Sequence, residues 1–429
     1  MPSASRDEER ILQEIDRSEV ADLAVALGNI ASPSGDEIEM ADYLETWLKD
    51  AGLAPFRQHA APGRDNVIAV LNGSGGGGEG GGGRSLLFNS HMDTQVPDPF
   101  DPGLPAEGQG LEKRAWLEDG KVFGIGVVND KGPMAAFLVA ATALRKSGIK
   151  LRGDVILTMV VGEIGTAPVD EFQGPRYLGN GFGSRHLVDQ GVRADFSLVA
   201  EATHFGVTWA EAGVLYVKLT VRGERRYAPF VDNAPPPRDS AHSVLKAADL
   251  IRGIQEWAVE YEEKNSIDLA CGRMVPKVNI GAVRAGRPYD PSCSPPACHL
   301  YVDIRLTPDG DPAQVVEELE TVSRKRGTPA EAHVFLHEPG SVATNIEPLR
   351  DALESAHGRI LGKKLEGVAP PETSMWRDLN VFNRAGIPSL TYGPGAPTGG
   401  GMKYLIVEDL ERAARVYALT AYYTCREAS

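Results

Sequence analysis

The spacing of hydrophobic positions changes several times along the chain, and each change marks a new element. From residue 7 to about residue 52 the apolar positions follow a helical period. Within this region Ser34 and Glu37 have the spacing of a capping box at the start of a second helix. Uninterrupted apolar strands then alternate with helices, a pattern typical of an α/β sheet covered on both faces. The predicted elements are strands at 66–71, 85–89, 154–161 and 196–200 and a helix at 133–147.

A different pattern begins near Glu211, where apolar and polar residues alternate along the strands. The predicted strands are 214–221, 277–283, 298–306 and 331–336, and the helices are 240–261 and 312–323. This β-α-β-β-α-β order is typical of a small α+β sandwich with one sheet face open to water. The first pattern resumes after Gly340, with a helix at 348–361, a strand at 389–392 and a helix at 407–424. We therefore predict an α/β domain over 1–208 and 340–429, interrupted by an inserted α+β domain over 209–339.

Composition narrows the functional classes. The 429 residues are 42% hydrophobic and 24% charged, which is an ordinary globular balance and argues against a disordered chain. The net charge of −15, without a run of Lys or Arg, argues against nucleic-acid and anionic-lipid partners. Apolar stretches fall short of the ~18 residues that span a bilayer. Four cysteines are too few for a disulfide framework, and we expect reduced thiols in a cytoplasmic protein.

The chain carries one low-complexity segment. Nine of the twelve residues over 72–83 are glycine. Because glycine has every backbone conformation open to it and no side chain to pack, we expect a flexible loop between two strands.

Polar residues that carry chemistry follow the ends of predicted strands, where open α/β sheets bind ligands. His91 and Asp93 stand directly after the strand at 85–89. A histidine and an aspartate at this spacing are able to act as a metal-binding imidazole and a carboxylate that fixes its orientation. The other three segments at strand ends are 124–132, 161–165 and 200–203.

In their order and context these four segments resemble the two-metal hydrolases that include aminoacylases, acetylornithine deacetylases and succinyl-diaminopimelate desuccinylases. The resemblance implies an α/β three-layer metallopeptidase (phosphorylase/hydrolase-like) catalytic domain. It also implies that the inserted domain is a ferredoxin-like α+β lid and dimerisation domain. We therefore expect a small-molecule substrate and a homodimer or higher homo-oligomer formed through the inserted domain. His91, Asp93 and Glu201 match the family pattern.

Departures from this pattern concentrate at the metal positions. Asn129 stands where the family has an aspartate that bridges two ions, and Asp130 lies beside it. By spacing, Gly399 stands where the last metal-binding histidine belongs, and no histidine follows His357. A neutral amide oxygen bridges two ions poorly. We expect one labile divalent transition-metal ion per subunit (Mn, Zn or Co), held by His91, Glu201 and either Asn129 or Asp130.

The catalytic and substrate-binding positions are also altered. Gly162 stands where the family has its general base, and Glu163 is the retained second member of the glutamate pair. Glu163 is the best candidate for the base, with an inert remnant as the alternative, while Asp130 is equally a candidate helix cap. Tyr227 replaces a lid histidine that reaches the partner's active site. The candidate substrate-binding residues, each of which has a structural alternative, are Arg225, Arg226, Tyr227, Arg305 and Arg377.

Three functions fit these residues. The first is amide hydrolysis by a dipeptidase or N-acyl-amino-acid deacylase, whose usual base and lid histidine are both replaced here. The second is hydrolysis of another C–N bond in a small carboxylate-bearing substrate, and here the profile resembles 5-nitroanthranilate aminohydrolases of the wider family, which replace an aryl amine by hydroxyl and release ammonia. The third is a catalytically dead binding scaffold. We favour the second, with Glu163 as base and Asp93 as the group that orients His91.

Overall fold

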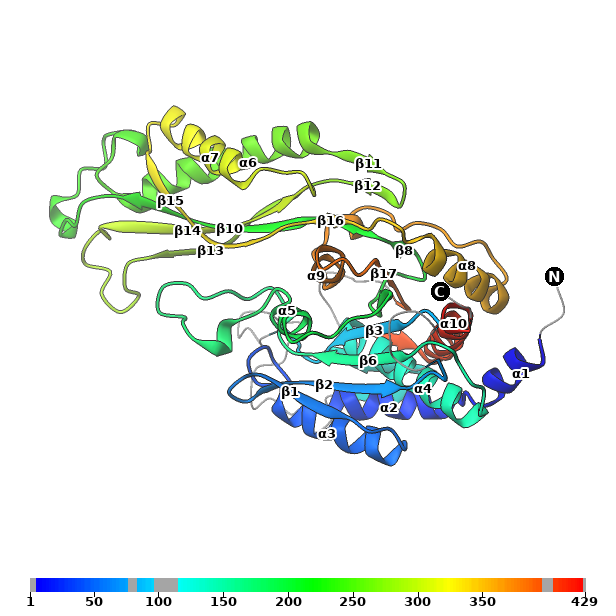
Figure 1. The fold of residues 1–429 in the computed structure, drawn as a ribbon. Coiled ribbons are helices and arrows are strands. Elements are labelled where there is room, and N and C mark those ends of the chain that lie inside the picture. Colours follow the sequence, from blue (N-terminus) through cyan, green and yellow to red (C-terminus); the bar gives the residue numbers. More distant parts are fainter. Residues whose placement is uncertain (1–4, 76–82, 96–114, 396–403, 427–429) are drawn as a thin grey trace. The chain divides into compact units, whose positions relative to one another are not determined.

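The chain folds into two compact units, drawn in Figure 1 from a computed structural model that describes residues 5–75, 83–95, 115–395 and 404–426. Unit 1 comprises Met1–Ala210, Val342–Val368 and Arg377–Ser429, and unit 2 comprises Glu211–Ser341 and Ala369–Trp376. Most of the glycine-rich segment, and the prediction for Gly399, lie outside the described residues.

Unit 2 takes in a segment, Ala369–Trp376, that the sequence pattern places with the catalytic domain. The reason is a pair of hydrogen bonds to the chain around a β-hairpin of unit 2. Thr373 Oγ1 donates to the carbonyl of Arg273, and Ser374 Oγ accepts the N–H of Val275 at 3.1 Å.

A mixed seven-stranded sheet forms the centre of unit 1. Strand β3 pairs in parallel with β6 and β7, and β17 pairs in parallel with β7. Because the carboxyl ends of parallel strands meet at one edge of a sheet, the loops after β3, β6 and β7 converge there. In spatial order the strands are β1 (Phe56–Ala61), β2 (Arg64–Leu71), β6 (Val155–Val160), β3 (Leu86–His91), β7 (Phe196–Val199), β17 (Ser389–Tyr392) and β8 (Val207–Thr208).

Helices pack on this sheet (Figure 1). The apolar side chains between the helices and the sheet are buried. Phe88 of β3 stacks on Phe137 of α4 with 5.7 Å between ring centroids, and its edge meets Tyr417 of α10. A single π-turn, Val127–Lys131, leads into α4. The helices are α1 (Arg6–Gln13), α2 (Arg17–Asn29), α3 (Ile38–Asp50), α4 (Gly132–Ser147), α5 (Phe182–Asp189), α8 (Glu347–Leu361), α9 (Leu379–Arg384) and α10 (Val407–Cys425). A smaller sheet joins β4 (Ala115–Glu118), β5 (Lys121–Gly124) and β18 (Tyr404–Ile406).

The capping box predicted from Ser34 and Glu37 does not form. Helix α3 begins at Ile38, and its N-cap side chain makes no capping hydrogen bond. Ser34 Oγ instead donates to Asp93 at 2.6 Å, and Glu37 accepts two hydrogen bonds from the buried Arg64. Both side chains are drawn to buried charges, which form stronger hydrogen bonds than a neutral backbone N–H.

Unit 2 is an antiparallel four-stranded sheet with two helices on one face. Alternate residues of its strand β14 are buried, as the sequence pattern predicts. Two residues of the buried face, Leu215 and Val302, pack with Leu250 and Leu319 of the helices. The strands lie in the order β13 (Val278–Ala285), β14 (Ala297–Leu306), β10 (Gly213–Arg222) and β15 (Ala330–Glu338), and the helices are α6 (Ser243–Asn265) and α7 (Pro312–Lys325).

Short elements complete the chain. Unit 2 adds a hairpin that the sequence pattern does not predict, formed by β11 (Ile267–Leu269) and β12 (Gly272–Met274). The two-residue strands β9 (Ala210–Glu211) and β16 (Ser341–Val342) stand where the chain passes between the units. The 3₁₀ turns are Pro175–Tyr177, Ala228–Phe230, Pro237–Asp239 and Glu372–Ser374.

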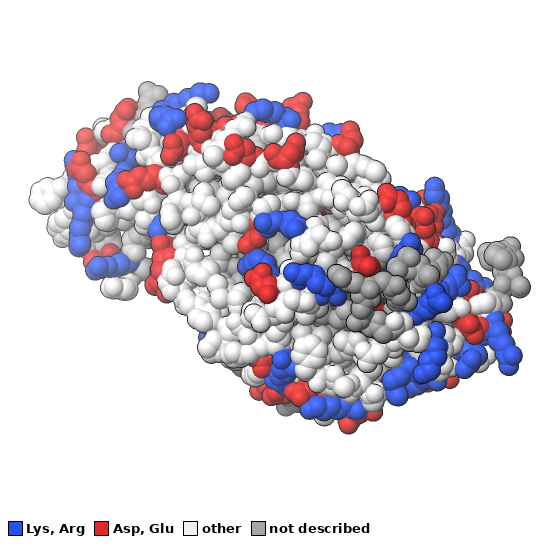
Figure 2. Space-filling model, viewed as in Figure 1, with Lys and Arg blue, Asp and Glu red and all other residues white. Residues whose placement is uncertain are grey.

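In Figure 2 basic side chains lie among acidic ones, and other residues cover a large part of the visible face. All four cysteines are free. Within the described residues, no helix combines the length and the apolar composition that crossing a membrane requires.

Candidate metal centre

Three buried side chains converge where the parallel strands of unit 1 end. His91 is the last residue of β3, Glu163 follows β6 and Glu201 follows β7. One ligand atom from each of the three lies within 4.8 Å of the others. An imidazole and two carboxylates form a donor set that suits manganese, zinc or cobalt.

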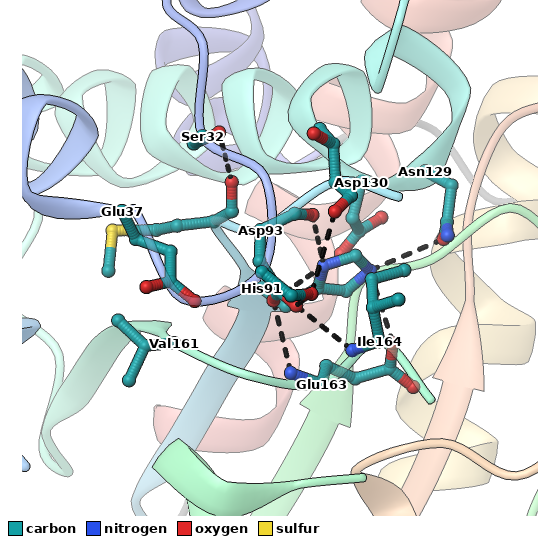
Figure 3. Close-up of polar contacts among 12 residues, drawn as sticks. Ser32, Glu37, His91, Asp93, Asn129, Asp130, Val161, Glu163 and Ile164 are labelled. Carbon is teal, nitrogen blue, oxygen red and sulfur yellow. Dashed lines mark hydrogen bonds and ion pairs between the residues drawn. The ribbon is translucent and has the colours of Figure 1, made fainter. Parts of the chain in front are cut away.

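The ring of His91 has a fixed orientation at the centre of this cluster (Figure 3). Its Nδ1 lies 2.9 Å from the backbone carbonyl of Asp93, and a carbonyl only accepts, so Nδ1 carries the proton. The Nε2 lone pair therefore faces oxygens of Asn129, at 3.3 Å, and Glu163, at 3.6 Å. Lone pairs in this arrangement repel one another unless a cation or a proton lies among them.

Asp93 holds the loop after β6 in place. Its carboxylate accepts the backbone N–H groups of Glu163 and Ile164, both at 3.0 Å, and the hydroxyl of Ser34. Burial opposes the ionised form of Asp93, but hydrogen bonds from His91 and Ser34 lower its pKa below the ordinary value. Asp93 is thus an ionised carboxylate that holds the backbone of Glu163, and its Oδ1 also lies 3.3 Å from Nδ1 of His91.

Asn129 and Asp130, which the sequence leaves as alternative ligands, point in different directions. The side-chain oxygen of Asn129 faces His91 Nε2. Asp130 accepts the hydroxyl of Ser90 through Oδ2, while its buried Oδ1 has no hydrogen-bond partner among the described residues. Asp130 lies within the π-turn and does not cap α4, whose first residue is Gly132.

The two carboxylate oxygens of Glu201 have different surroundings. Oε2 accepts a hydrogen bond of 2.6 Å from Nε of the buried Arg377. Oε1 is buried and has no hydrogen-bond partner among the described residues. A buried carboxylate oxygen without a donor is costly, and a cation in the cluster removes that cost.

Negative charge accumulates around the cluster. Burial raises the pKa of Glu163 well above its ordinary value, and repulsion from Glu201 adds to the rise. Burial and then Glu201 raise the pKa of Asp130 in the same way. Burial alone would lower the pKa of His91, yet the Glu163 and Asp93 carboxylates raise it well above the ordinary value. These shifts show that the cluster favours added positive charge, and the residues therefore fit a divalent metal ion.

Gly162, at the position where the family resemblance implies a general base, has no room for a side chain. Its φ is +67°, a left-handed conformation, and a Cβ there would lie 2.6 Å from Nη2 of Arg64 and 2.8 Å from the carbonyl of Leu178. Arg64 is fully buried and cannot withdraw, because Glu37 and the carbonyls of Pro175 and Leu178 hold it.

The remaining candidate substrate-binding residues belong to unit 2. Arg226 is paired with Glu224 at 2.6 Å, and Arg305 is paired with Asp303 at 2.9 Å. The guanidinium of Arg225 lies 3.8 Å from the sulfur of Cys293. Tyr227 is exposed, with its ring 6.2 Å from that of Phe230. Arg377, in contrast, belongs to unit 1 and contacts the metal candidate Glu201.

Two site residues have no counterpart in the sequence prediction. Asp378 is buried next to Arg377 and accepts a 2.9 Å hydrogen bond from Asn89 of β3. Burial raises its pKa to about 6. The sequence carries a faint signal for Asp378, namely an Arg-Asp pair between apolar residues, but nothing in it shows that Asn89 turns toward this pair.

Comparison with known proteins places these features in a family context. The model of peptidase family M20/M25/M40 matches residues 87–423. The N-formyl-4-amino-5-aminomethyl-2-methylpyrimidine deformylase of Halalkalibacterium halodurans is 26% identical over 425 residues, covering 90% of each chain. The succinyl-diaminopimelate desuccinylase of Methylocella silvestris is 26% identical over 398 residues, covering 89% of this chain and 92% of the relative.

Solved structures share the fold at low sequence identity. A dipeptidase from Saccharomyces cerevisiae has a TM-score of 0.72 at 12% identity and covers 98% of this chain and 99% of its own. A dinuclear metal-binding peptidase from Bacillus subtilis has a TM-score of 0.58 at 15% identity and covers 95% of this chain and 98% of its own. The metallopeptidase-like fold and the family resemblance predicted from the sequence are thus confirmed.

Proposed function

The chain belongs to peptidase family M20/M25/M40, and on that premise we propose that it hydrolyses a C–N bond of a small, carboxylate-bearing substrate at a centre with one divalent metal ion. The bond joins an activated aromatic ring to its amino group, and the specific substrate is 5-nitroanthranilate. Water replaces the amino group, so the products are the corresponding phenol and ammonia.

The observation that carries this proposal is the single carboxylate at the end of β6. Glu163 faces the ligand cluster, whereas the backbone of Gly162 is closed to a second acid by Arg64. The resemblance stated above implies that amide hydrolysis in this family uses two adjacent glutamates, one as base and one as ligand. Here Glu163 has no adjacent glutamate with which to share the roles of base and ligand.

Displacement from an electron-poor aromatic ring makes smaller demands on such a site. The negative charge of the addition step spreads into the ring and its nitro group, so the reaction dispenses with a separate site for a carbonyl oxyanion. The substrate's own electronic structure then supplies stabilisation that an amide substrate requires from the protein.

Each residue of the centre has a distinct part in this proposal. His91 and Glu201 hold the ion together with Asn129, and a bound ion supplies Lewis acidity that lowers the pKa of water. Glu163 takes the proton from the attacking water, a role typically worth ~10²–10⁴ in rate. Asp93 keeps His91 and the backbone of Glu163 in register.

Hydrolysis of an amide or peptide bond is the second candidate. It is favoured by the names of the relatives, which include a deformylase, a desuccinylase and dipeptidases. The ligand cluster alone does not separate the two reactions, because both need an ion and a base.

A substrate screen separates the candidates. Enzyme loaded with Mn²⁺, Co²⁺ or Zn²⁺ is incubated with aminobenzoates, including 5-nitroanthranilate, and with N-acyl amino acids and dipeptides. We expect ammonia release with a change in ultraviolet absorption from the nitro-substituted aminobenzoate. Release of a carboxylic acid or an amino acid instead would establish the amidase alternative. A binding scaffold without catalysis would give neither product with any of the three ions.

A further inference from the structure

Arg377 brings a permanent positive charge into the buried centre. Its side chain is buried immediately before α9, and Nε donates to Glu201 Oε2 at 2.6 Å. Nη2 also lies 3.3 Å from the carbonyl oxygen of Ala202. A guanidinium stays protonated in proteins, so this charge does not depend on pH in the working range.

The charge is placed at one of the two carboxylate oxygens of Glu201. In Glu201 the guanidinium occupies Oε2, which leaves Oε1 as the oxygen without a hydrogen-bond partner among the described residues. One oxygen is thus neutralised by protein, and one is left for a cation.

The surrounding carboxylates explain why a fixed cation is needed there. Asp130, Glu163 and Asp378 are all buried near Glu201, and each repels it. A buried carboxylate without a counter-charge is costly, and that cost is met either by metal ions or by a cationic side chain.

We propose that the guanidinium of Arg377 takes the place of a second metal ion at Glu201, so that the centre binds one divalent ion per chain. The inference rests on the ion of the proposed function but not on its substrate or reaction. It makes Arg377 a positioning residue, because its charge also fixes the orientation in which Glu201 offers Oε1.

The test measures metal binding rather than catalysis. Mn²⁺ is titrated into the metal-free full chain by calorimetry, and the loaded protein is examined by electron paramagnetic resonance. Three proteins are compared, namely the wild type, Arg377→Lys, which keeps the charge, and Arg377→Gln, which removes it. We expect one ion per chain and an isolated six-line Mn²⁺ signal for the wild type and for Arg377→Lys.

The variant without the charge carries the decisive outcome. Arg377→Gln frees Glu201 Oε2 and adds one unit of net negative charge, so we expect a second Mn²⁺ per chain and the signal of a spin-coupled pair. One ion in Arg377→Gln, bound as tightly as in the wild type, overturns the inference. Two ions in the wild type or in Arg377→Lys also overturn it, which keeps the test decisive if circular dichroism shows Arg377→Gln to be unfolded.

The same data separate this inference from the proposed function. A change from one ion to two on loss of Arg377 supports the inference even where neither aryl amines nor amides are hydrolysed. Conversely, ammonia release by a wild type that binds two ions keeps the proposed reaction and removes the role given to Arg377.

Discussion

Nη2 of Arg64 lies 2.6 Å from the point that a Cβ on Gly162 would occupy. Glu37 and the carbonyls of Pro175 and Leu178 hold the guanidinium by hydrogen bonds, so it cannot move away from the end of β6. The absence of a side chain at 162 is therefore built into the packing of unit 1, and replacing Gly162 alone does not restore a second acid.

Gly162→Ala is expected to destabilise the protein by about 2–5 kcal/mol. The left-handed backbone costs an alanine about 1–2 kcal/mol, and crowding against Arg64 adds about 1–3 kcal/mol. Urea unfolding followed by circular dichroism measures the change.

Gly120→Ala is the matched control for this variant. Its φ of +70° is close to the +67° of Gly162, but no heavy atom lies within 4 Å of its added Cβ. It should lose the backbone contribution alone. Equal losses in the two variants would contradict the steric role assigned to Arg64.

Asp93→Asn is expected to weaken Mn²⁺ binding by about 10–100-fold, the usual effect of removing a group that orients a metal ligand. The amide has one accepting oxygen, whereas the carboxylate accepts from the N–H groups of both Glu163 and Ile164. Calorimetric titration of metal-free protein gives the affinity.

Ser34→Ala tests whether this effect belongs to the carboxylate itself. That change removes the 2.6 Å hydroxyl contact to Asp93 and leaves both backbone contacts in place. We expect a smaller loss of affinity than in Asp93→Asn. If Ser34→Ala lowers the affinity as much, the orientation of Asp93 depends on the hydroxyl and not on its charge.

Much of the fold follows from local pattern. The alternation along Cys298–Leu306 and the continuous apolar run along Val155–Val160 directly report which faces are buried, and both strands lie where the pattern predicts. The capping box fails because Ser34 and Glu37 have partners, Asp93 and Arg64, that lie 59 and 27 residues away in sequence. A local motif carries no information about such distant charges.

The candidate site, too, can be predicted only in part from the sequence. His91 and Glu201 are predictable because strand ends place their residues at one sheet edge. The pairing of Arg377 with Glu201 joins residues 176 positions apart and has no periodic signal, so the sequence leaves Arg377 as one of several arginines. The sequence also gives no sign that Arg64 blocks a side chain at position 162. This depends on the φ of Gly162 and on the position of the Arg64 guanidinium.

Glu163→Gln is expected to lower the rate by about 10²–10⁴ while the metal content stays near one ion per chain. The amide keeps the shape of the side chain and its place in the loop held by Asp93, but it accepts no proton at neutral pH. Steady-state kinetics and metal analysis are needed on the same preparation.

Parallel loss of metal and rate would instead make Glu163 a ligand, a role its place in the cluster with His91 and Glu201 allows. An unchanged rate would remove Glu163 from the mechanism and direct attention to Asp130.

Self-association is expected to involve the edge of the sheet in unit 2. Strand β13 is an edge strand with an exposed Val283, and uncovered edges of this kind pair readily with a second copy. Val283→Lys should shift the protein toward monomer in sedimentation velocity at micromolar concentration. Val259→Lys, at an exposed valine of helix α6, should leave assembly unchanged. A wild type that sediments as a monomer would refute the expectation.

We expect the buried His357 to make the folded protein less stable in mild acid. Its ring is buried between helix α8 and strand β17, with Nδ1 2.9 Å from the hydroxyl of Tyr392. Burial, and then repulsion by Lys363, lowers the pKa of His357 from 6.5 to about 4. The unfolded chain therefore binds a proton near pH 6.5 that the folded chain refuses until about pH 4.

This difference fixes the sign of the effect. Between those two pH values the unfolded state binds more protons, so the free energy of unfolding falls as the pH falls. The contribution of His357 is fully present above pH 6.5, and about 1 kcal/mol of it is lost by pH 5.5. Urea unfolding at pH 8 and at pH 5.5 measures this loss.

His357→Gln removes the titrating group and keeps a polar side chain next to Tyr392. The variant is expected to be less stable than the wild type at pH 8, because the packing of the ring is lost, but to lose about 1 kcal/mol less between pH 8 and pH 5.5. His59→Gln is the matched control, since that histidine is exposed in β1 and pairs with Asp65. An identical pH dependence in the wild type and in His357→Gln would show that the buried imidazole is not the group that sets the acid limit.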